Sequence, residues 1–318
     1  MAVALTALTS AACASSGETI SGEGTITKST TRIASVDLAD PNRDTSKTCR
    51  AATDADPGAA DPLRIVVTDE SLLDPLCGLG IQSRVVGAPT LGGVFPAGLH
   101  YLGPWLATVK PIGDQGAIDA ARTSATNPDL VLSLGSNPVA GQVKVPSVII
   151  AASQSWQDTF LAVARAVGRA TAGQNRLDDL TRITKDIGRG IDAAHTQASL
   201  VQLSNNAITV AGTAPFAAQI MTMLGVQRPA AQRVPGPIAV SEKNLQDADG
   251  DIIYVGFSTP DQAFGRKTLT SDSWLALGAP SAKRVFIVDD PLWFGPGGLA
   301  AAWCVVWDIQ ITINGASS

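Results

Sequence analysis

The sequence contains few of the residues on which most catalytic and metal sites depend. Only two of its 318 residues are histidines, His100 and His195, and 16% are charged, whereas about a quarter is usual. A histidine-rich metal site or a histidine-based catalytic triad is therefore disfavoured. The G-x-x-x-x-G-K-[ST], G-x-S-x-G and H-E-x-x-H motifs are absent. Asp289 and Asp290 are adjacent carboxylates, but before Pro291 they favour a turn. We therefore predict a protein that is not an enzyme and has no intrinsic cofactor.

The sequence also lacks an excess of basic residues and any long apolar run. Its 23 Lys and Arg against 28 Asp and Glu give a net charge of −5, which argues against binding to nucleic acid. No apolar run reaches the roughly 20 residues of a membrane span. Hydrophobic residues make up 45% of the chain, enough for a large core, and the length suits two domains.

The amino-terminal residues have the pattern of an export signal followed by a tether. Residues 1–13 are small and apolar and end in Cys13, which is typical of a lipoprotein signal whose cysteine is lipidated after cleavage. Ser10 replaces the usual aliphatic residue and no basic residue precedes Lys28, so a plain amino-terminal extension is the alternative. Residues 14–46 are rich in Ser, Thr, Gly and Asp, which predicts a flexible tether. We expect an extracytoplasmic protein that contacts the membrane through this lipid anchor only.

The remaining cysteines indicate one disulfide. Cys49 and Cys77 are close in sequence, and in an exported chain such a pair is expected to form a disulfide, here between the amino-terminal segment and the first helix. Two separate thiols are the alternative. Cys304 lies in the apolar segment AAAWCVVW and is expected to be buried.

Strand-like and helix-like segments alternate along the chain, which predicts an α/β protein with parallel sheets covered by helices. The clearest helix is 174–196, where apolar residues recur at spacings of three and four. It would be about 35 Å long at 1.5 Å per residue. We predict two Rossmann-like lobes, residues 47–173 and 198–318, joined by a rigid linking helix at 174–197. Buried strands are expected at 63–70, 83–89, 128–135, 145–151, 251–257 and 284–290, and paired strands at 199–204 and 207–212.

Two stretches have the pattern of a known family, PIGDQGAIDAARTSATNPDLVLSLG (111–135) and SDSWLALGAPSAKRVFIVDDPLWFGPGGLAAAWCVVWDI (271–309). They resemble the iron–siderophore periplasmic binding proteins of ABC transporters. With 210–234 and the signal, the resemblance covers most of 46–312 and is strongest to lipoproteins of the ferric dicitrate-binding type. It implies a class III, TroA-like fold, with the ligand held between two lobes joined by a long helix. It also implies capture of a ferric siderophore or ferric citrate outside the membrane and delivery to an ABC permease.

The resemblance further implies two surface acids, one per lobe, that dock onto the permease. Their expected positions are Ala121 and Lys243, and the nearest carboxylates are Asp119 and Glu242. A one-residue shift rotates a side chain by about 100° on a helix. The prediction is docking through Asp119 and Glu242. Because of the shifted positions, a scaffold for cell-envelope partners, derived from a binding protein, is the alternative.

Ligands of open α/β sheets bind outside the carboxyl ends of the strands. Aromatic side chains near these ends can stack on a chelate, and Arg233 can pair with the carboxylates of an anionic ferric complex. Tyr101 beside His100 can ligate iron, which makes a haem carrier the rival hypothesis, whereas packing of the last helix is the alternative role for Trp293. The predicted ligand-binding residues are Tyr101, Trp105, His100, Arg233, Trp293 and Phe294.

Overall fold

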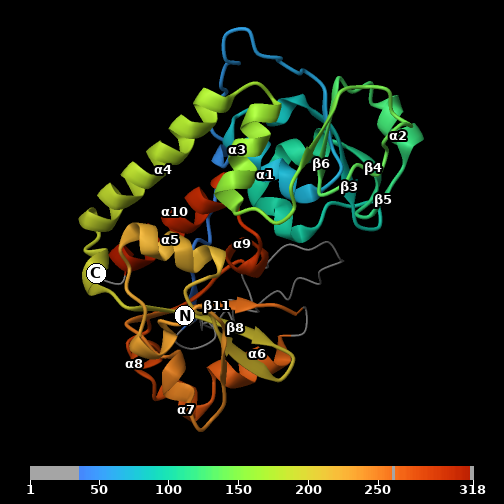
Figure 1. The fold of residues 1–318 in the computed structure, drawn as a ribbon. Helices are drawn as coiled ribbons and strands as arrows, with labels where there is room; N and C mark the ends of the chain where they lie inside the picture. Colours follow the sequence, from blue (N-terminus) through green and yellow to red (C-terminus); the bar gives the residue numbers. More distant parts are fainter. Residues whose placement is uncertain (1–35, 260–261, 316–318) are drawn as a thin grey trace, which may run out of the picture.

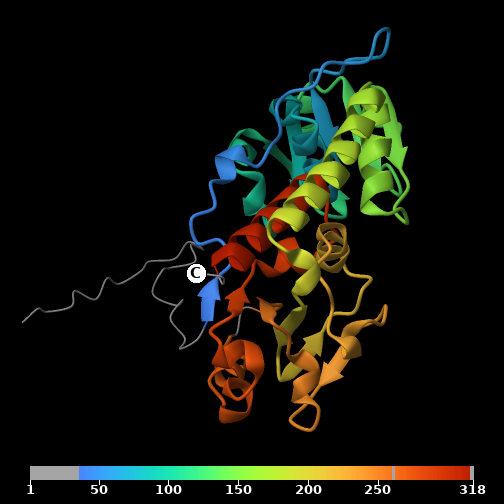
Figure 2. The same cartoon turned by 90° about the vertical axis from the view of Figure 1, so that its left-hand side faces the viewer.

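Two six-stranded sheets, one in each lobe, make up the framework of the protein. The computed structural model describes residues 36–259 and 262–315. The predicted signal (1–13), its Cys13 and residues 14–35 of the predicted tether lie outside the described residues. No helix in the described ranges is both long enough and apolar enough to cross a membrane. The α/β class and the division into two lobes joined by a long helix agree with the prediction (Figures 1 and 2).

The sheet of the first lobe has the strand order β5-β4-β3-β2-β6-β7. Its strands are β2 (Ile65–Val67), β3 (Val85–Thr90), β4 (Lys110–Asp114), β5 (Ala117–Ile118), β6 (Leu130–Leu134) and β7 (Ser147–Ile150). All neighbours are parallel except β4 and β5. Both faces are buried, since Ile65 and Val67 join one apolar cluster and Val66 another, and this explains the continuous apolar runs. The helices are α1 (Leu73–Gly78), α2 (Ala120–Ala125) and α3 (Trp156–Ala166), with 3-10 turns η3 (Glu70–Leu72), η4 (Gln82–Arg84), η5 (Ala97–Leu102) and η6 (Pro104–Thr108).

The sheet of the second lobe has the order β1-β12-β11-β8-β9-β10. Its strands are β1 (Val36–Leu38), β8 (Ala198–Ser204), β9 (Ala207–Val210), β10 (Ile238–Val240), β11 (Ile252–Phe257) and β12 (Val285–Ile287). β1, β12, β11 and β8 are parallel, and β9 and β10 each run antiparallel to their predecessor. The helices are α5 (Phe216–Leu224), α6 (Ala263–Leu269), α7 (Asp272–Leu275), α8 (Gly278–Ser281) and α9 (Asp290–Phe294), with 3-10 turns η8 (Ala230–Gln232) and η9 (Leu245–Ala248).

The prediction of a flexible tether is wrong for residues 36–46. Strand β1 pairs in parallel with β12 of the second lobe, and Val36 is buried there. A 3-10 turn, η2 (Thr45–Lys47), follows it. The strand is too short to produce a periodic apolar pattern, and it exists because β12 offers an unpaired sheet edge. The amino-terminal segment therefore belongs to the lobe built mainly from the carboxyl-terminal half.

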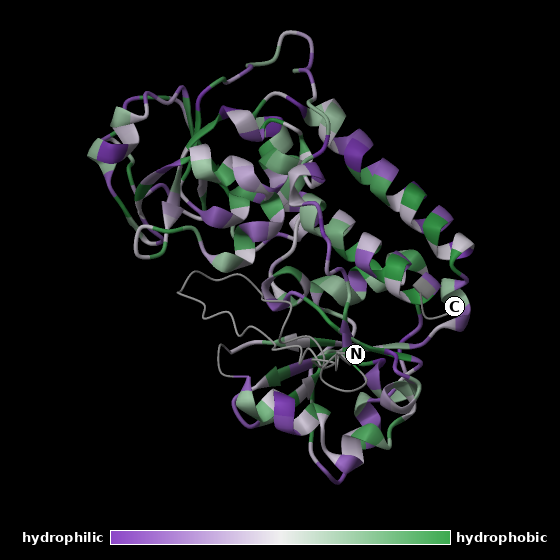
Figure 3. Cartoon of the chain, turned by 180° about the vertical axis from the view of Figure 1, so that it is seen from behind, coloured by the Kyte–Doolittle hydropathy of each residue, from purple (hydrophilic) through white to green (hydrophobic). Residues whose placement is uncertain are grey.

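The linking helix α4 runs from Ala170 to Gly190, so it begins before the predicted 174 and ends before the predicted 197. His195 lies in a separate 3-10 turn, η7 (Ala193–His195). One face of α4 is hydrophobic and the other hydrophilic (Figure 3), and it packs on α3 of one lobe and α5 of the other. At Gly188 an added Cβ would lie 1.8 Å from the carbonyl oxygen of Leu224. The close approach of α4 and α5 therefore requires glycine.

The last helix, α10 (Leu299–Gly315), lies between the lobes and beside α4 (Figure 2). It contacts α1 and α3 as well as α5 and α9, so the predicted boundary of the second lobe, 198–318, is wrong for this helix. Residues of α10 belong to a single apolar cluster that contains both Ile65 of the first sheet and Tyr254 of the second. The two lobes consequently share one continuous core.

Candidate ligand-binding site between the lobes

The two lobes also meet where η5 of the first touches α9 of the second. A Cβ added at Gly98 would lie 2.6 Å from Cβ of Pro291, so the absence of a side chain at Gly98 permits this contact. Gly98 and Pro291 line two pockets. We call these the Tyr101 pocket and the His100 pocket, after a residue that lines each.

The Tyr101 pocket has a volume of about 230 Å³. It lies beside the carboxyl end of β2, where η3 begins, and Leu99 and Leu292 give it an apolar wall. Its titratable side chains are Glu70, Asp74 and Tyr101. Burial, assisted by the neighbouring carboxylate of Asp69, raises the pKa of Glu70.

The His100 pocket is larger, about 410 Å³. Three parallel strands end at it: β1, followed by Asp40 and Arg43, β11, which ends at Phe257, and β12, followed by Asp289 and Asp290. It therefore occupies the place, outside the carboxyl ends of parallel strands, where ligands of α/β sheets bind. Ala97, Gly98 and His100 of η5 form the wall contributed by the first lobe.

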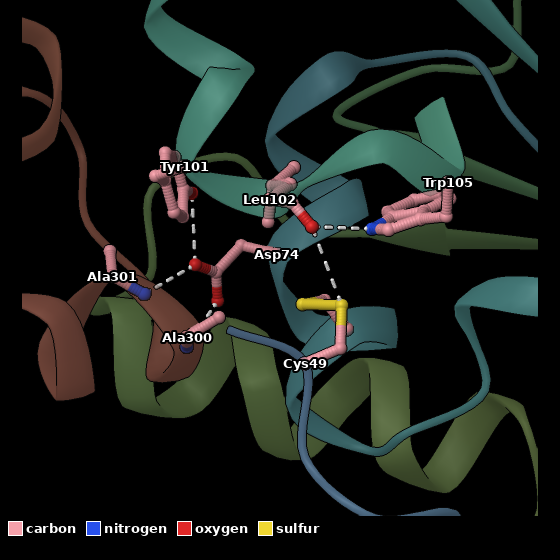
Figure 4. The surroundings of a disulfide bond; sticks show 8 residues. Cys49, Asp74, Tyr101, Leu102, Trp105, Ala300 and Ala301 are labelled. Carbon is pink, nitrogen blue, oxygen red and sulfur yellow. Dashed lines mark hydrogen bonds between the residues drawn. A yellow bond between two sulfur atoms is a disulfide. The ribbon is translucent and has the colours of Figure 1, made fainter. Parts of the chain in front are cut away.

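Tyr101 is held by a buried carboxylate. The Tyr101 hydroxyl donates a 2.9 Å hydrogen bond to Asp74, which also accepts bonds from the backbone N–H groups of Ala300 and Ala301 (Figure 4). Burial raises the pKa of Asp74, and the three donors oppose that shift. Asp74 belongs to α1 and the two amides to the first turn of α10, where a negative charge is favourable. Tyr101 is 8% exposed. It lines the Tyr101 pocket, and its hydroxyl is at the same time hydrogen-bonded to Asp74.

Trp293 is a core residue, and its predicted role in ligand binding is wrong. Its side chain is fully buried, and its ring lies 4.6 Å from that of Tyr254. Nε1 donates a 2.9 Å hydrogen bond to Asp308 Oδ2, and Arg43 pairs with the other oxygen of Asp308 at 2.5 Å. Burial raises the pKa of Asp308 to about 6. A buried indole N–H usually has a hydrogen-bond partner, and here Asp308 of α10 is the acceptor.

Trp105 and Phe294 line neither pocket. Trp105 donates a 2.7 Å hydrogen bond to the carbonyl oxygen of Leu102, on the side away from Tyr101 (Figure 4). The ring of Phe294 packs over Gly256 near the end of β11, where an added Cβ would lie 2.6 Å from it. Both rings are partly buried against the shared core, so the structure uses them for packing.

Arg233 lies at the opposite edge of the second sheet, and its predicted convergence with the cleft aromatics is wrong. The carbonyl oxygen of its neighbour Val234 accepts a hydrogen bond from the N–H of Thr213, which follows β9. Because β9 is antiparallel to β8, its carboxyl end lies beside the amino end of β8, away from the His100 pocket. Arg233 Nε donates to the carbonyl oxygen of Arg228.

His100 and Tyr101 do not converge on one position. His100 is exposed and lines the larger pocket, whereas Tyr101 lines the smaller one. The two side chains therefore do not form a pair of axial ligands for haem. Within residues 36–259 and 262–315 there is also no group of three or more His, Cys, Asp or Glu side chains arranged to hold a metal ion.

The predicted disulfide between Cys49 and Cys77 is present, and Cys304 is a buried free thiol, as predicted. The disulfide attaches the segment after η2 to α1. The Sγ atom of Cys49 also lies 3.7 Å from the carbonyl oxygen of Leu102 in η5 (Figure 4). The disulfide thus lies against η5, the segment that forms part of the wall of both pockets.

The two candidate docking acids lie on separate lobes. Asp119 caps α2, since its side chain accepts a 2.9 Å hydrogen bond from the backbone N–H of Arg122, and it lies 3.9 Å from the Arg122 guanidinium. Glu242 is exposed between β10 and η9. Their role in docking stays a prediction.

Sequence reasoning missed several residues that the two pockets bring together. Glu70 lies within three residues of the end of β2, and Asp289 and Asp290 lie within three residues of the end of β12. These positions were a usable signal, although the aspartates were expected to form a turn. Asp40 and Arg43 carried no such signal, because they lie in the segment predicted to be a tether.

The chain is similar to known binding proteins over most of its length. Residues 65–292 match the family model described as periplasmic binding protein. The probable siderophore-binding lipoprotein YfiY of Bacillus subtilis is 24% identical over 270 residues, which cover 79% of this chain and 82% of the relative.

Two similar solved structures support the fold. SirA of Staphylococcus aureus complexed with staphyloferrin B has a TM-score of 0.61 and 20% identity, covering 80% of this chain and 94% of that one. FhuD2 of Staphylococcus aureus with bound ferrioxamine B has a TM-score of 0.61 and 16% identity, covering 81% and 100%. They confirm the predicted fold of two lobes joined by a long helix. The match over residues 65–292 confirms the predicted family: the chain belongs to the periplasmic binding protein family.

Proposed function

We propose that this protein is an extracytoplasmic receptor that binds a ferric siderophore between its lobes and delivers it to an ABC importer in the membrane. The observation that carries the proposal is the His100 pocket, which lies where three parallel strands end and where both lobes contribute walls. Such a concave, partly apolar position is typical of small-molecule sites. The relatives support the same ligand class, because one is named as a siderophore-binding lipoprotein and two were solved with staphyloferrin B or ferrioxamine B.

The pockets suit a chelate whose own donor atoms already fill the coordination sphere of the iron. With no metal-binding cluster among the described residues, the protein contributes shape, apolar contact and a few polar groups, while the chelator supplies the iron ligands. Attachment through a lipidated Cys13 would keep such a receptor close to its permease.

Titration of tryptophan fluorescence with ferric siderophores tests the proposal. We expect saturable quenching at one chelate per protein, because Trp293 lies in α9, two residues from Pro291, which lines both pockets. The iron-free chelators serve as controls for inner-filter and non-specific effects. A bulky substitution at the shared wall, Gly98→Trp, should weaken binding of every ferric chelate, whereas Gly190→Trp on the far helix α4, where nothing lies within 4 Å, should not. Failure of all ferric chelates to bind would refute the proposed function.

A further inference from the structure

We infer that the interlobe site selects an uncharged or positively charged ferric chelate and rejects polyanionic complexes such as ferric dicitrate. This inference rests on the proposed function and narrows the substrate class of the same site. It starts from the charges that line the two pockets. Within the described part of the chain, their lining includes no lysine and a single arginine, Arg43.

Arg43 is not available to an anionic ligand. Its guanidinium pairs at 2.5 Å with Asp308, whose side chain is 2% exposed, and its own side chain is 18% exposed. Removing Arg43 from this pair would leave a buried carboxylate without its counter-charge, which is costly. Arg266 of α6 donates a hydrogen bond to Gln262, which lines the His100 pocket, and is exposed. Solvent weakens an interaction at such a position.

Carboxylates outnumber cations around the pockets. Asp40, Asp289 and Asp290 line the His100 pocket and Glu70 lines the Tyr101 pocket. None of the four has a salt bridge to another residue in the described ranges. His100 is the remaining titratable side chain of the larger pocket. Arg43 interacts electrostatically with Asp40 and Asp289, but one cation does not balance these carboxylates, so the field inside the site is negative.

Two of these carboxylates, Asp289 and Asp290, are only partly exposed. Burial raises the pKa of Asp289 and of Asp290. Gln202 Nε2 donates a 2.8 Å hydrogen bond to Asp290 and orients it. A cation placed in the pocket would gain from charges that water solvates incompletely, while an anion would be repelled by the same groups. Arg233, the group expected to attract anionic ferric citrate, lies at the other edge of the sheet and does not reverse this balance.

Competition between chelates of different charge tests the inference. The probes are ferrioxamine B, which carries a protonated amine, ferrichrome, which is uncharged, and ferric dicitrate, which is anionic. At low ionic strength we expect ferrioxamine B and ferrichrome to bind at least about tenfold more tightly than ferric dicitrate, with a smaller difference in 0.5 M salt because screening is stronger.

Variants locate the origin of the preference. Asp289→Asn, Asp290→Asn and Glu70→Gln should each reduce the preference for ferrioxamine B over ferric dicitrate several-fold, with little change for ferrichrome. Asp54→Asn, which removes an exposed carboxylate outside both pockets, is the matched control. Circular dichroism establishes that each variant is folded. Glu70 lies in η3 and the two aspartates lie at the start of α9, so the test survives if a variant at one of these two places does not fold.

The possible failures are distinct. If ferric dicitrate binds as tightly as ferrioxamine B, or if the three pocket variants all leave the preference unchanged, the inference is wrong while the receptor function stands. If none of the three ferric chelates binds, the proposed function itself fails.

Discussion

Asp74 Oδ2, in the first helix of one lobe, accepts a 2.8 Å hydrogen bond from the backbone N–H of Ala301 at the start of the last helix. A carboxylate from α1 thereby caps α10, which packs on both lobes. The bond joins segments 227 residues apart. Tyr101 of η5 donates a hydrogen bond to the same carboxylate. Asp74 therefore connects the pocket wall formed by η5 with the helix that lies between the lobes.

Substitution of Asp74 should destabilise the whole protein. Asp74→Ala leaves two buried amides and one buried hydroxyl without their acceptor, and we expect a loss of about 3 kcal/mol in the free energy of unfolding. Tyr101→Phe removes one donor only and should cost about 1–2 kcal/mol. Asp119→Ala, at the exposed cap of α2, provides the comparison and should cost less than about 1 kcal/mol. Urea unfolding measures all three, and equal losses at Asp74 and Asp119 would show that Asp74 does not connect the lobes.

Asp308 should make stability depend on pH. Its pKa is raised from 3.8 to about 6 by burial, although Arg43 and Trp293 oppose the shift. Between about pH 4 and pH 6 the folded state then binds more protons than the unfolded state, so the contribution of this group to stability falls as pH rises through that window. A shift of this size corresponds to on the order of 3 kcal/mol.

The difference in unfolding free energy between the native protein and Asp308→Asn isolates this effect. We expect the free energy of unfolding of the native protein to exceed that of the variant by more at pH 4 than at pH 7. The emission of Trp293, which donates to Asp308, should change over the same range and lose that change in the variant. A difference that grows with rising pH would contradict the raised pKa.

The disulfide should contribute strongly to stability. Cys49 and Cys77 are separated by 28 residues, for which chain-entropy arguments give about 3–4 kcal/mol. The double variant Cys49→Ser, Cys77→Ser should lose this amount in denaturant unfolding. Thiol counting on unfolded, unreduced protein should detect Cys304 and, if it is not lipidated, Cys13. Detection of Cys49 and Cys77 as free thiols would exclude the bridge.

Ligand binding should change the angle between the lobes only slightly. Helix α4 has no glycine or proline between Gly173 and Gly188, and one apolar cluster extends through both lobes and α10. Hinge closure would have to break this core. Small-angle scattering should give nearly equal radii of gyration with and without a ferric chelate, and a large decrease on binding would disprove the rigid connection.

Delivery to the permease should depend on surface acids rather than on the pockets. The Asp119→Lys, Glu242→Lys double variant should lose most uptake while binding its ligand normally, since charges at an interface rim chiefly govern association. Asp119→Asn retains a capping side chain and separates loss of charge from loss of the α2 cap. Normal uptake by the double variant would favour a different docking surface, or a scaffold role in the cell envelope.

Local patterns in the sequence determined the alternation of strands and helices, the long helix between the lobes and the cysteine pair. Each depends on periodicity or spacing over a few turns of chain, as in the repeat of Leu177, Leu180 and Ile187 along α4. The family resemblance added the fold type and the role, and the comparisons confirm the family and the fold.

Tertiary structure decided which residues meet. Trp293 and Arg43 became parts of one buried group because Asp308, 265 residues from Arg43, lies between them. Arg233 lies away from the pocket because β9 runs antiparallel to β8. The composition of the chain does not determine this strand direction. Strand β1 joined the distant sheet because β12 had a free edge. Such outcomes depend on long-range pairing and on the burial of shared surfaces, which the sequence of a single segment does not reveal.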